Sequence, residues 1–139
     1  MNRSGLAEVA HTSVTGKLTV NAIGAAETYV ALDVTGDITG QIAVNPNVHL
    51  QVYFDGNMDV KARDLGNNTG LAGNLQFYGI SPPRDANGIP QWTQTINLNS
   101  GTPSTLTLTF YAPSADVILN ENPDFLGAWS ARLFTGTET

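Results

Sequence analysis

The sequence has 139 residues, a formal net charge of −6 and no cysteine. Only 13% of the residues are charged, and the abundance of Thr, Asn, Gly and Ser argues against helical bundles, coiled coils and nucleotide-binding α/β enzymes. The lack of cysteine excludes a thiol nucleophile, a Cys-ligated zinc site and disulfides, and the scattered basic residues offer no stripe for nucleic acid.

A single β domain is predicted over residues 1–139, beginning with an N-terminal segment over residues 1–14. Within that segment, residues 4–11 are the one stretch in which we expect a short helical turn, capped by Ser4 and weakened by Gly5. Beyond it, apolar and polar residues alternate with the period of two that is typical of strands. The predicted strands are 17–23, 28–34, 37–44, 48–54, 74–78, 93–98, 105–111, 115–119 and 128–134.

Residues 81–91 interrupt this alternation with three prolines and no periodicity, so we expect a long surface loop there. The adjoining Trp92 either anchors the loop to the domain or presents an exposed contact residue. Further along, Pro113 is predicted to end a strand, because proline cannot donate to a β-ladder. Gly127 is predicted to let the backbone pass close to a neighbouring coil.

A short pattern of glycine, polar, apolar and polar residues recurs along the first half of the chain. It begins at Gly16, Gly36 and Gly56, which are evenly spaced, and again at Gly73 after a slightly shorter interval. A repeat of about 20 residues is typical of stacked coils that bury their apolar faces against one another. The predicted fold is therefore a right-handed parallel β-solenoid with coils of about 20 residues. The alternative is an antiparallel β-sandwich, in which Asp-Gly and Thr-Gly turns also recur.

Four segments carry a resemblance to a known family: YFDGNMDV at 53–60, GNLQFYG at 73–79, FYAPSADV at 110–117 and NPDFLGA at 122–128. In this order they resemble an uncharacterised bacterial domain found C-terminally in pilus-assembly proteins of the PilX type and in other cell-surface proteins. The resemblance covers about residues 48–134 and implies a repetitive β domain outside the cell, with no established active site. The family's closing His-Tyr-Asp stretch and its pilin-like hydrophobic N-terminal helix have no counterpart in this sequence.

Few residues form a pattern that suggests metal chemistry. His11 and His49 are far apart in the sequence and show no ligand-spacing signature, so we expect two solvated histidines rather than zinc ligands. Asp55, Asn57 and Asp59 begin like a calcium loop, but the later positions required of an EF-hand are missing. Calcium is thus the one candidate cofactor, held on this acidic edge with help from Asp33 or Asp37 of an adjacent coil; the alternative is a solvated edge.

Two kinds of exposed side chain suggest a binding surface. Thr105, Thr107 and Thr109 form a row on the outward phase of a strand, which would bind ordered water or a neighbouring chain. Trp92 and Tyr111, together with other aromatic residues, would offer stacking surface to glycans; the alternative for these rings is packing within the domain. The other aromatic residues considered are Tyr53, Tyr78 and Trp129.

The sequence lacks every catalytic motif we sought, including a nucleophile elbow, a phosphate loop and a dinucleotide fingerprint. We therefore expect a non-enzymatic structural or adhesive domain of a bacterial pilus-associated or cell-surface protein, whose partners are copies of itself or other surface proteins. The alternatives are a carbohydrate-binding or polysaccharide-acting β-helix, with glycans as partners, and a filament former resembling the bactofilins. No apolar run is long enough to span a membrane, and we expect the export signal to lie outside this sequence.

Overall fold

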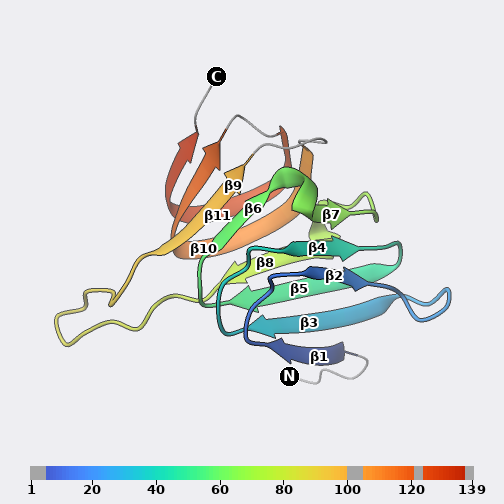
Figure 1. The fold of residues 1–139 in the computed structure, drawn as a ribbon, viewed down its shortest axis with the longest axis horizontal. Helices are drawn as coiled ribbons and strands as arrows, with labels where there is room; N and C mark the ends of the chain where they lie inside the picture. The colour runs from blue at the N-terminus through green and yellow to red at the C-terminus, as the bar shows by residue number, and fades with distance from the viewer. Residues whose placement is uncertain (1–5, 100–104, 121–123, 137–139) are drawn as a thin grey trace.

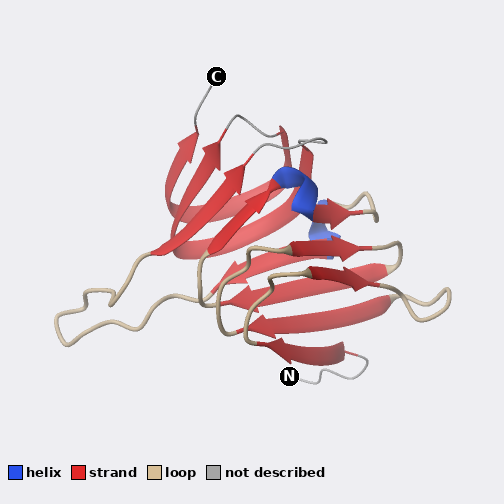
Figure 2. Cartoon of the chain, viewed as in Figure 1, coloured by secondary structure: helices blue, strands red, loops and turns tan. Residues whose placement is uncertain are grey.

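The computed structural model describes residues 6–99, 105–120 and 124–136. Parallel strands stack coil upon coil into a β-solenoid, which confirms the predicted fold (Figure 1). The helical turns within the described residues are two short 3₁₀ segments, η1 (Ala62–Asp64) and η2 (Ala72–Asn74), drawn in blue in Figure 2.

The larger sheet runs the length of the solenoid and continues around one of its corners. Its pairs are parallel, and its first side is ordered β1-β3-β5-β8-β10, with β11 on the far side of β10. The second side of the solenoid lies around this corner. There, the second half of β10 pairs with β9, and β9 pairs with β6. The strands are β1 (Leu6–His11), β3 (Thr28–Val34), β5 (Val48–Phe54), β6 (Met58–Lys61), β8 (Leu75–Gly79), β9 (Gln94–Asn99), β10 (Thr105–Asn120) and β11 (Asp124–Gly136).

A smaller sheet closes a third side of the first coils. It consists of β2 (Lys17–Val20), β4 (Gln41–Val44) and β7 (Leu65–Asn67), again all parallel. Isolated bridges join Val14 to Ile38 and Ile38 to Met58, and so extend the second side down to the first coil. Within the described part of the chain, the third side ends at β7, so the later coils have a different cross-section from the earlier ones.

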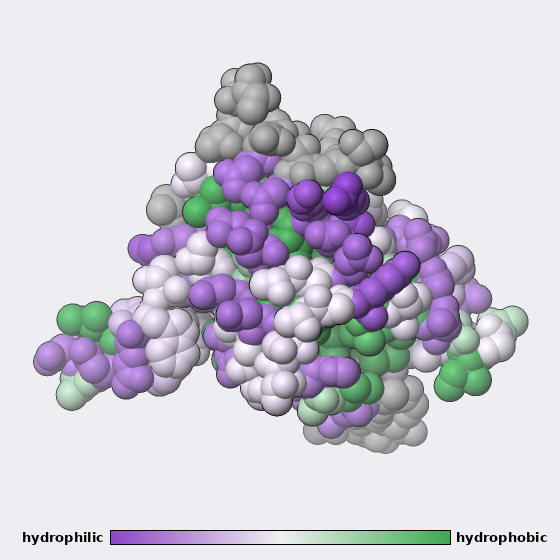
Figure 3. Space-filling model, in the orientation of Figure 1, coloured by the Kyte–Doolittle hydropathy of each residue, from purple (hydrophilic) through white to green (hydrophobic). Residues whose placement is uncertain are grey.

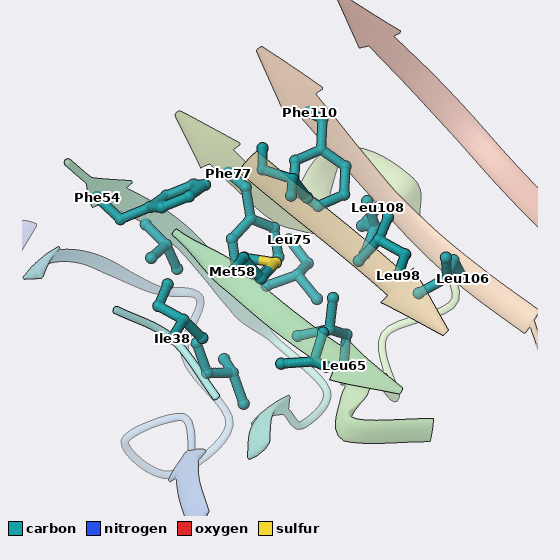
Figure 4. Packing of buried hydrophobic residues seen from close by; sticks show 14 of the residues in the cluster. Ile38, Phe54, Met58, Leu65, Leu75, Phe77, Leu98, Leu106, Leu108 and Phe110 are labelled. Atoms are coloured by element: carbon teal, nitrogen blue, oxygen red, sulfur yellow. The ribbon is translucent and has the colours of Figure 1, made fainter. Parts of the chain in front are cut away.

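The core lies inside these coils. It is built from every second residue of the strands, since these residues face inward. In β5, buried and half-buried residues alternate without a break, as the period of a strand requires. Phe54, Phe77 and Phe110 come from successive coils and contact each other, with ring centroids 6.3 and 5.1 Å apart (Figure 4). Each is at most 2% exposed, so each contributes about 1.5–3 kcal/mol through burial.

The expected helical turn over residues 4–11 is wrong for the residues that the structure describes. Residues 6–11 form β1, which pairs in parallel with β3 from Leu6 opposite Tyr29 to His11 opposite Val34. Residues 4 and 5 lie outside the described residues. Pairing with a neighbouring coil supplies backbone hydrogen bonds that a one-turn helix cannot match, so tertiary context overrides the weak local preference.

Strand bounds also differ where the chain turns corners. The predicted strand 37–44 divides into the bridge at Ile38 and β4, and the short strands β6 and β7 were not predicted. The prediction that Pro113 ends a strand is wrong as stated, because β10 continues through it. The proline instead marks a bend: the register shifts between Ala112 and Asp116, and the partner of β10 changes from β8 to β9. An extended proline is tolerated there because the ladder is already interrupted.

The glycine repeat does not keep its even period in space. Gly56 lies over Gly36 as predicted, but Gly40, rather than Gly36, lies over Gly16. Gly73 lies in η2, just before β8 on the first side of the solenoid, so it is not stacked on Gly16, Gly36 or Gly56. On the second side, the chain between paired residues is shortest from Ile38 to Met58 and longest from Met58 to Ile96. Coil length is therefore variable, although the strands stack regularly.

Candidate functional site

A row of tyrosines crosses the outer face of the larger sheet. Tyr53 of β5 pairs with Tyr78 of β8, and Tyr78 pairs with Tyr111 of β10. The rings of Tyr53 and Tyr78 are nearly parallel, with centroids 4.9 Å apart. The ring of Tyr111 is tilted, and its centroid lies 6.4 Å from that of Tyr78. We call these three residues the tyrosine row. Its last member, Tyr111, is 54% exposed and was predicted as a binding residue.

Glutamines on the same strands orient the first two rings of the tyrosine row. The Tyr53 hydroxyl donates to Gln51 Oε1 at 3.0 Å, and the Tyr78 hydroxyl donates to Gln76 Oε1 at 2.6 Å. Gln51 Nε2 in turn donates to Gln76 Oε1 at 3.4 Å. Burial, followed by repulsion from Tyr53, raises the pKa of Tyr78, so this phenol stays protonated. The row is consequently an aromatic surface in which hydrogen bonds orient the first two rings.

The two histidines lie on different coils. His11 ends β1, whereas His49 in β5 stacks on Tyr29 of β3 with ring centroids 4.3 Å apart. His49 Nε2 also lies 2.6 Å from Glu27 Oε2. Since its register partners differ from those of His11, the structure does not bring the two imidazoles together.

The predicted calcium residues surround the corner between β5 and β6. Asp55 and Asn57 lie in the turn, and Asp59 lies within β6. The Asn57 side chain accepts a 2.9 Å hydrogen bond from the backbone N–H of Thr95, and Asp59 accepts one of the same length from Asn99 Nδ2. These oxygens therefore link adjacent coils. Within the described residues, no group of three or more acidic or histidine side chains has an arrangement that could hold a metal ion.

Sequence reasoning missed two ladders of polar side chains at the corners. In the first, Asn45 Nδ2 donates to Asn21 Oδ1 at 2.5 Å, and Asn68 Nδ2 donates to Asn45 Oδ1 at 2.8 Å. In the second, Asn99 donates to Asp59, and Asn120 Nδ2 donates to Asn99 Oδ1 at 2.7 Å. Amide ladders of this kind are typical of stacked parallel strands. The signal was present as an asparagine shortly after each strand of the smaller sheet.

The predicted threonine row lies at the start of β10. Thr105 is exposed, while Thr107 and Thr109 are half-buried. Thr109 Oγ1 donates to the carbonyl of Ala72 at 3.4 Å, so η2 shields part of the row. Thr109 pairs with Gln76 on β8, so the threonines do not extend to that neighbouring strand.

Residues 80–93 connect β8 to β9 and project from the solenoid as a loop (Figure 1). A bridge between Arg84 and Pro90 closes the loop, and the Asp85 carboxylate accepts hydrogen bonds from the N–H groups of Asn87 and Ile89. Figure 3 shows hydrophobic surface near its outer end. Ile89 is 58% exposed, and the bridge and the Asp85 hydrogen bonds give the loop internal order.

A groove of about 440 Å³ separates this loop from the corner formed by β10 and β11. One wall carries Arg84 and Trp92 of the loop, and the other carries Ser114 of β10 and Arg132 of β11. Trp92 is 46% exposed, so this predicted binding residue belongs to the groove and not to the core. We call this site the loop groove.

The two ends of the solenoid are also candidate contact surfaces. β1 lies at one end and β11 at the other (Figure 1), and no described strand pairs with the outer edge of either. Val9 of β1 is 41% exposed, although it continues the inward row of Leu32, Val52 and Phe77. Gly127 in β11 passes close to the carbonyl of Leu108, as predicted for this position.

The chain matches a known family of domains. A family model described as a domain of unknown function (DUF7305) matches residues 9–138. No curated protein and no solved structure matches the chain. Among the described residues, there is no helix with the length and apolarity needed to cross a membrane.

Proposed function

We propose that this chain, which belongs to the family of domains of unknown function DUF7305, is a non-enzymatic structural and adhesive domain of a bacterial pilus-associated or cell-surface protein. The resemblance of its second half to domains of PilX-type proteins supports a place outside the cell. Its partners are copies of itself or other surface proteins.

The two outer edges of the larger sheet, at β1 and β11, carry this proposal, because no strand among the described residues pairs with either of them. An edge strand presents a row of free N–H and C=O groups to any strand that reaches it. β11 extends over 13 residues, from Asp124 to Gly136, which is long for an edge. Since every strand pair in the larger sheet is parallel, the strand direction at one end matches that at the other.

Association through these ends would be head to tail. Such contacts join different surfaces of identical chains, so they extend into filaments unless a rotation closes them. The outer strand of one domain would then add to the sheet of the next, and side chains of the inward row, such as Val9, would become buried. A surface protein could use this contact to join copies of itself or to bind the edge of another β protein.

The substitution Val9→Lys tests this contact. A lysine at an inward position of an edge strand opposes pairing with another chain. We expect light scattering of the wild-type domain to show a molar mass that rises with concentration, and the variant to remain monomeric. The matched control is Ile23→Lys, which introduces the same charge in the loop between β2 and β3, at a residue that is 80% exposed and outside β1 and β11.

A wild-type domain that stays monomeric at high concentration would contradict self-association, and equal effects of both lysines would contradict a contact through β1. Location is tested separately by protease treatment of intact cells that express the full-length gene. Degradation of the domain supports a surface location. Protection from protease combined with internal filaments would instead favour the bactofilin-like alternative.

A further inference from the structure

The loop groove is lined by basic residues, although the chain as a whole is acidic. The chain has twelve acidic and six basic residues. Two of the six basic residues, Arg84 and Arg132, line the groove, and no Asp or Glu is among its lining residues in the described part of the chain. The remaining lining side chains include the indole of Trp92 and the hydroxyl groups of Thr93 and Ser114.

Both guanidinium groups are held in place and retain donors for a ligand. Arg84 Nη1 donates to the carbonyl of Gly88 at 2.7 Å, so the loop itself orients this side chain. Arg132 Nη2 lies 2.7 Å from Asp116 Oδ2 and forms an ion pair with that carboxylate, which positions the guanidinium on the opposite wall and offsets part of its charge. Each guanidinium has five N–H donors in a planar fork, and the described contacts occupy only part of each fork. An incoming carboxylate can therefore be bound by paired hydrogen bonds.

We propose that the loop groove binds a carboxylated saccharide, that is, a uronic-acid residue of an acidic polysaccharide. The carboxylate pairs with a guanidinium, the apolar face of the sugar ring packs on the exposed indole of Trp92, and ring hydroxyls reach Thr93 and Ser114. The groove volume of about 440 Å³ lies within the usual range for small-ligand sites. A free phosphate would make no use of the indole, and an acidic peptide lacks the rigid ring face that the indole would cover.

This site would let the domain bind an acidic glycan on a cell or in a matrix, and it does not require self-association. It is built on the corner where β10 changes partners, supported by a 2.8 Å hydrogen bond between the Ser114 and Ser81 hydroxyls at the base of the loop. Arg132 belongs to β11, but the groove lies within one domain and includes no residue of β1. Ligand binding can therefore be measured on a monomer, and the two proposals can fail independently.

Calorimetric titration of the Val9→Lys protein with oligogalacturonate tests the proposal without interference from self-association. The methyl ester of the same oligomer is the matched neutral ligand, and oligoglutamate and inorganic phosphate represent the other anions. We expect binding of oligogalacturonate that weakens as salt is added, because exposed charges are screened. We also expect the methyl ester to bind at least about tenfold more weakly, because charge-assisted hydrogen bonds are lost.

Three variants assign the binding to the groove. Arg84→Gln and Trp92→Ala should each weaken binding about tenfold or more, whereas Arg63→Gln, an exposed arginine of η1 outside the groove, should not. Both groove changes lie in or beside an exposed loop, and circular dichroism checks that the fold is retained. The proposal is overturned if the acid does not bind, if its ester binds equally well, if oligoglutamate or phosphate binds as tightly, or if Arg63→Gln matches Arg84→Gln.

Discussion

Replacing Gly40 by alanine would test the stacking of the first two coils. A Cβ at this position would overlap the carbonyl oxygen of Gly16 and lie 2.6 Å from the carbonyl carbon of Thr15. These are backbone atoms, so no side-chain rotation can relieve the overlap. The same Gly16 oxygen accepts a 2.8 Å hydrogen bond from the N–H of Gln41, at the start of β4. The methyl group would therefore separate β4 from β2 where their pairing begins.

The expected loss of stability has two parts. Forcing one extra carbon into a well-packed site costs about 1–3 kcal/mol. Loss of the hydrogen bond from Gln41 adds about 0.5–1.5 kcal/mol. We expect Gly40→Ala to lower the free energy of unfolding by about 2–4 kcal/mol, a large share of the roughly 5–15 kcal/mol typical of a domain. The midpoint of thermal unfolding should fall by roughly 10 °C.

Gly16→Ala is the matched control, because Gly16 occupies the same corner one coil earlier. Among the described residues, no atom beyond its chain neighbours lies within 4 Å of its added Cβ. Alanine should therefore be neutral or stabilise the fold by up to about 1 kcal/mol, by restricting the unfolded chain. Thermal melts followed by circular dichroism compare the two variants. Equal stability would refute the observed register and favour the even register predicted from the glycine repeat, in which Gly40 occupies a position equivalent to Val20 and Val60.

Three further predictions concern the corners and the tyrosine row. Asn45→Ala removes two hydrogen bonds of the first asparagine ladder, and Asn21→Ala removes one. At about 1 kcal/mol per hydrogen bond, urea unfolding should show about twice the loss of stability for Asn45→Ala. Equal losses would show that the second hydrogen bond does not stabilise the fold. Because folding raises the pKa of Tyr78, the stability that this gives is complete below the ordinary tyrosine pKa and is lost as pH rises through the raised value. Tyr53→Phe should lower that pKa in a spectrophotometric titration, and no change would remove Tyr53 as a cause. Asn57→Ala, which loses the hydrogen bond from Thr95, should cost about 1 kcal/mol equally with EDTA and with calcium, whereas a loss seen only with calcium would support the predicted calcium site.

The longer strands could be predicted because apolar residues recur at every second position along them. β3 and β5 have the predicted bounds. β5 alternates between buried and half-buried residues along its whole length, and in β3 Val30, Leu32 and Val34 recur at every second position, although Ala31 between them is also buried. β6 and β7 have four and three residues, too few for an alternation to be recognised. β1 was missed because its identity as a strand depends on pairing with β3, which belongs to the next coil and begins only at Thr28.

The candidate sites were less predictable because they depend on the length of each coil. The interval along the chain from Tyr53 to its partner Tyr78 is shorter than the interval from Tyr78 to Tyr111, so no fixed period relates the three. Trp92 and Tyr111 were singled out as exposed aromatic residues, which they are, at 46% and 54%. Their neighbours were not predicted, because the lengths of the intervening coils determine which residues lie side by side on adjacent strands. The sequence pattern does not reveal those lengths.

Variation in coil length is also what gives this solenoid a groove. On the second side, the chain from Met58 to its partner Ile96 is almost twice as long as the chain from Ile38 to Met58, and residues 80–93 account for most of the difference. Such an insertion costs the fold little, because the entropy of closing a loop grows slowly with its length. The stacked strands hold the loop ends in place, and the loop brings Arg84 opposite Arg132 across the groove. A regular coil would leave only a flat surface at this corner, so the departure from the repeat is where selectivity for a small ligand can arise.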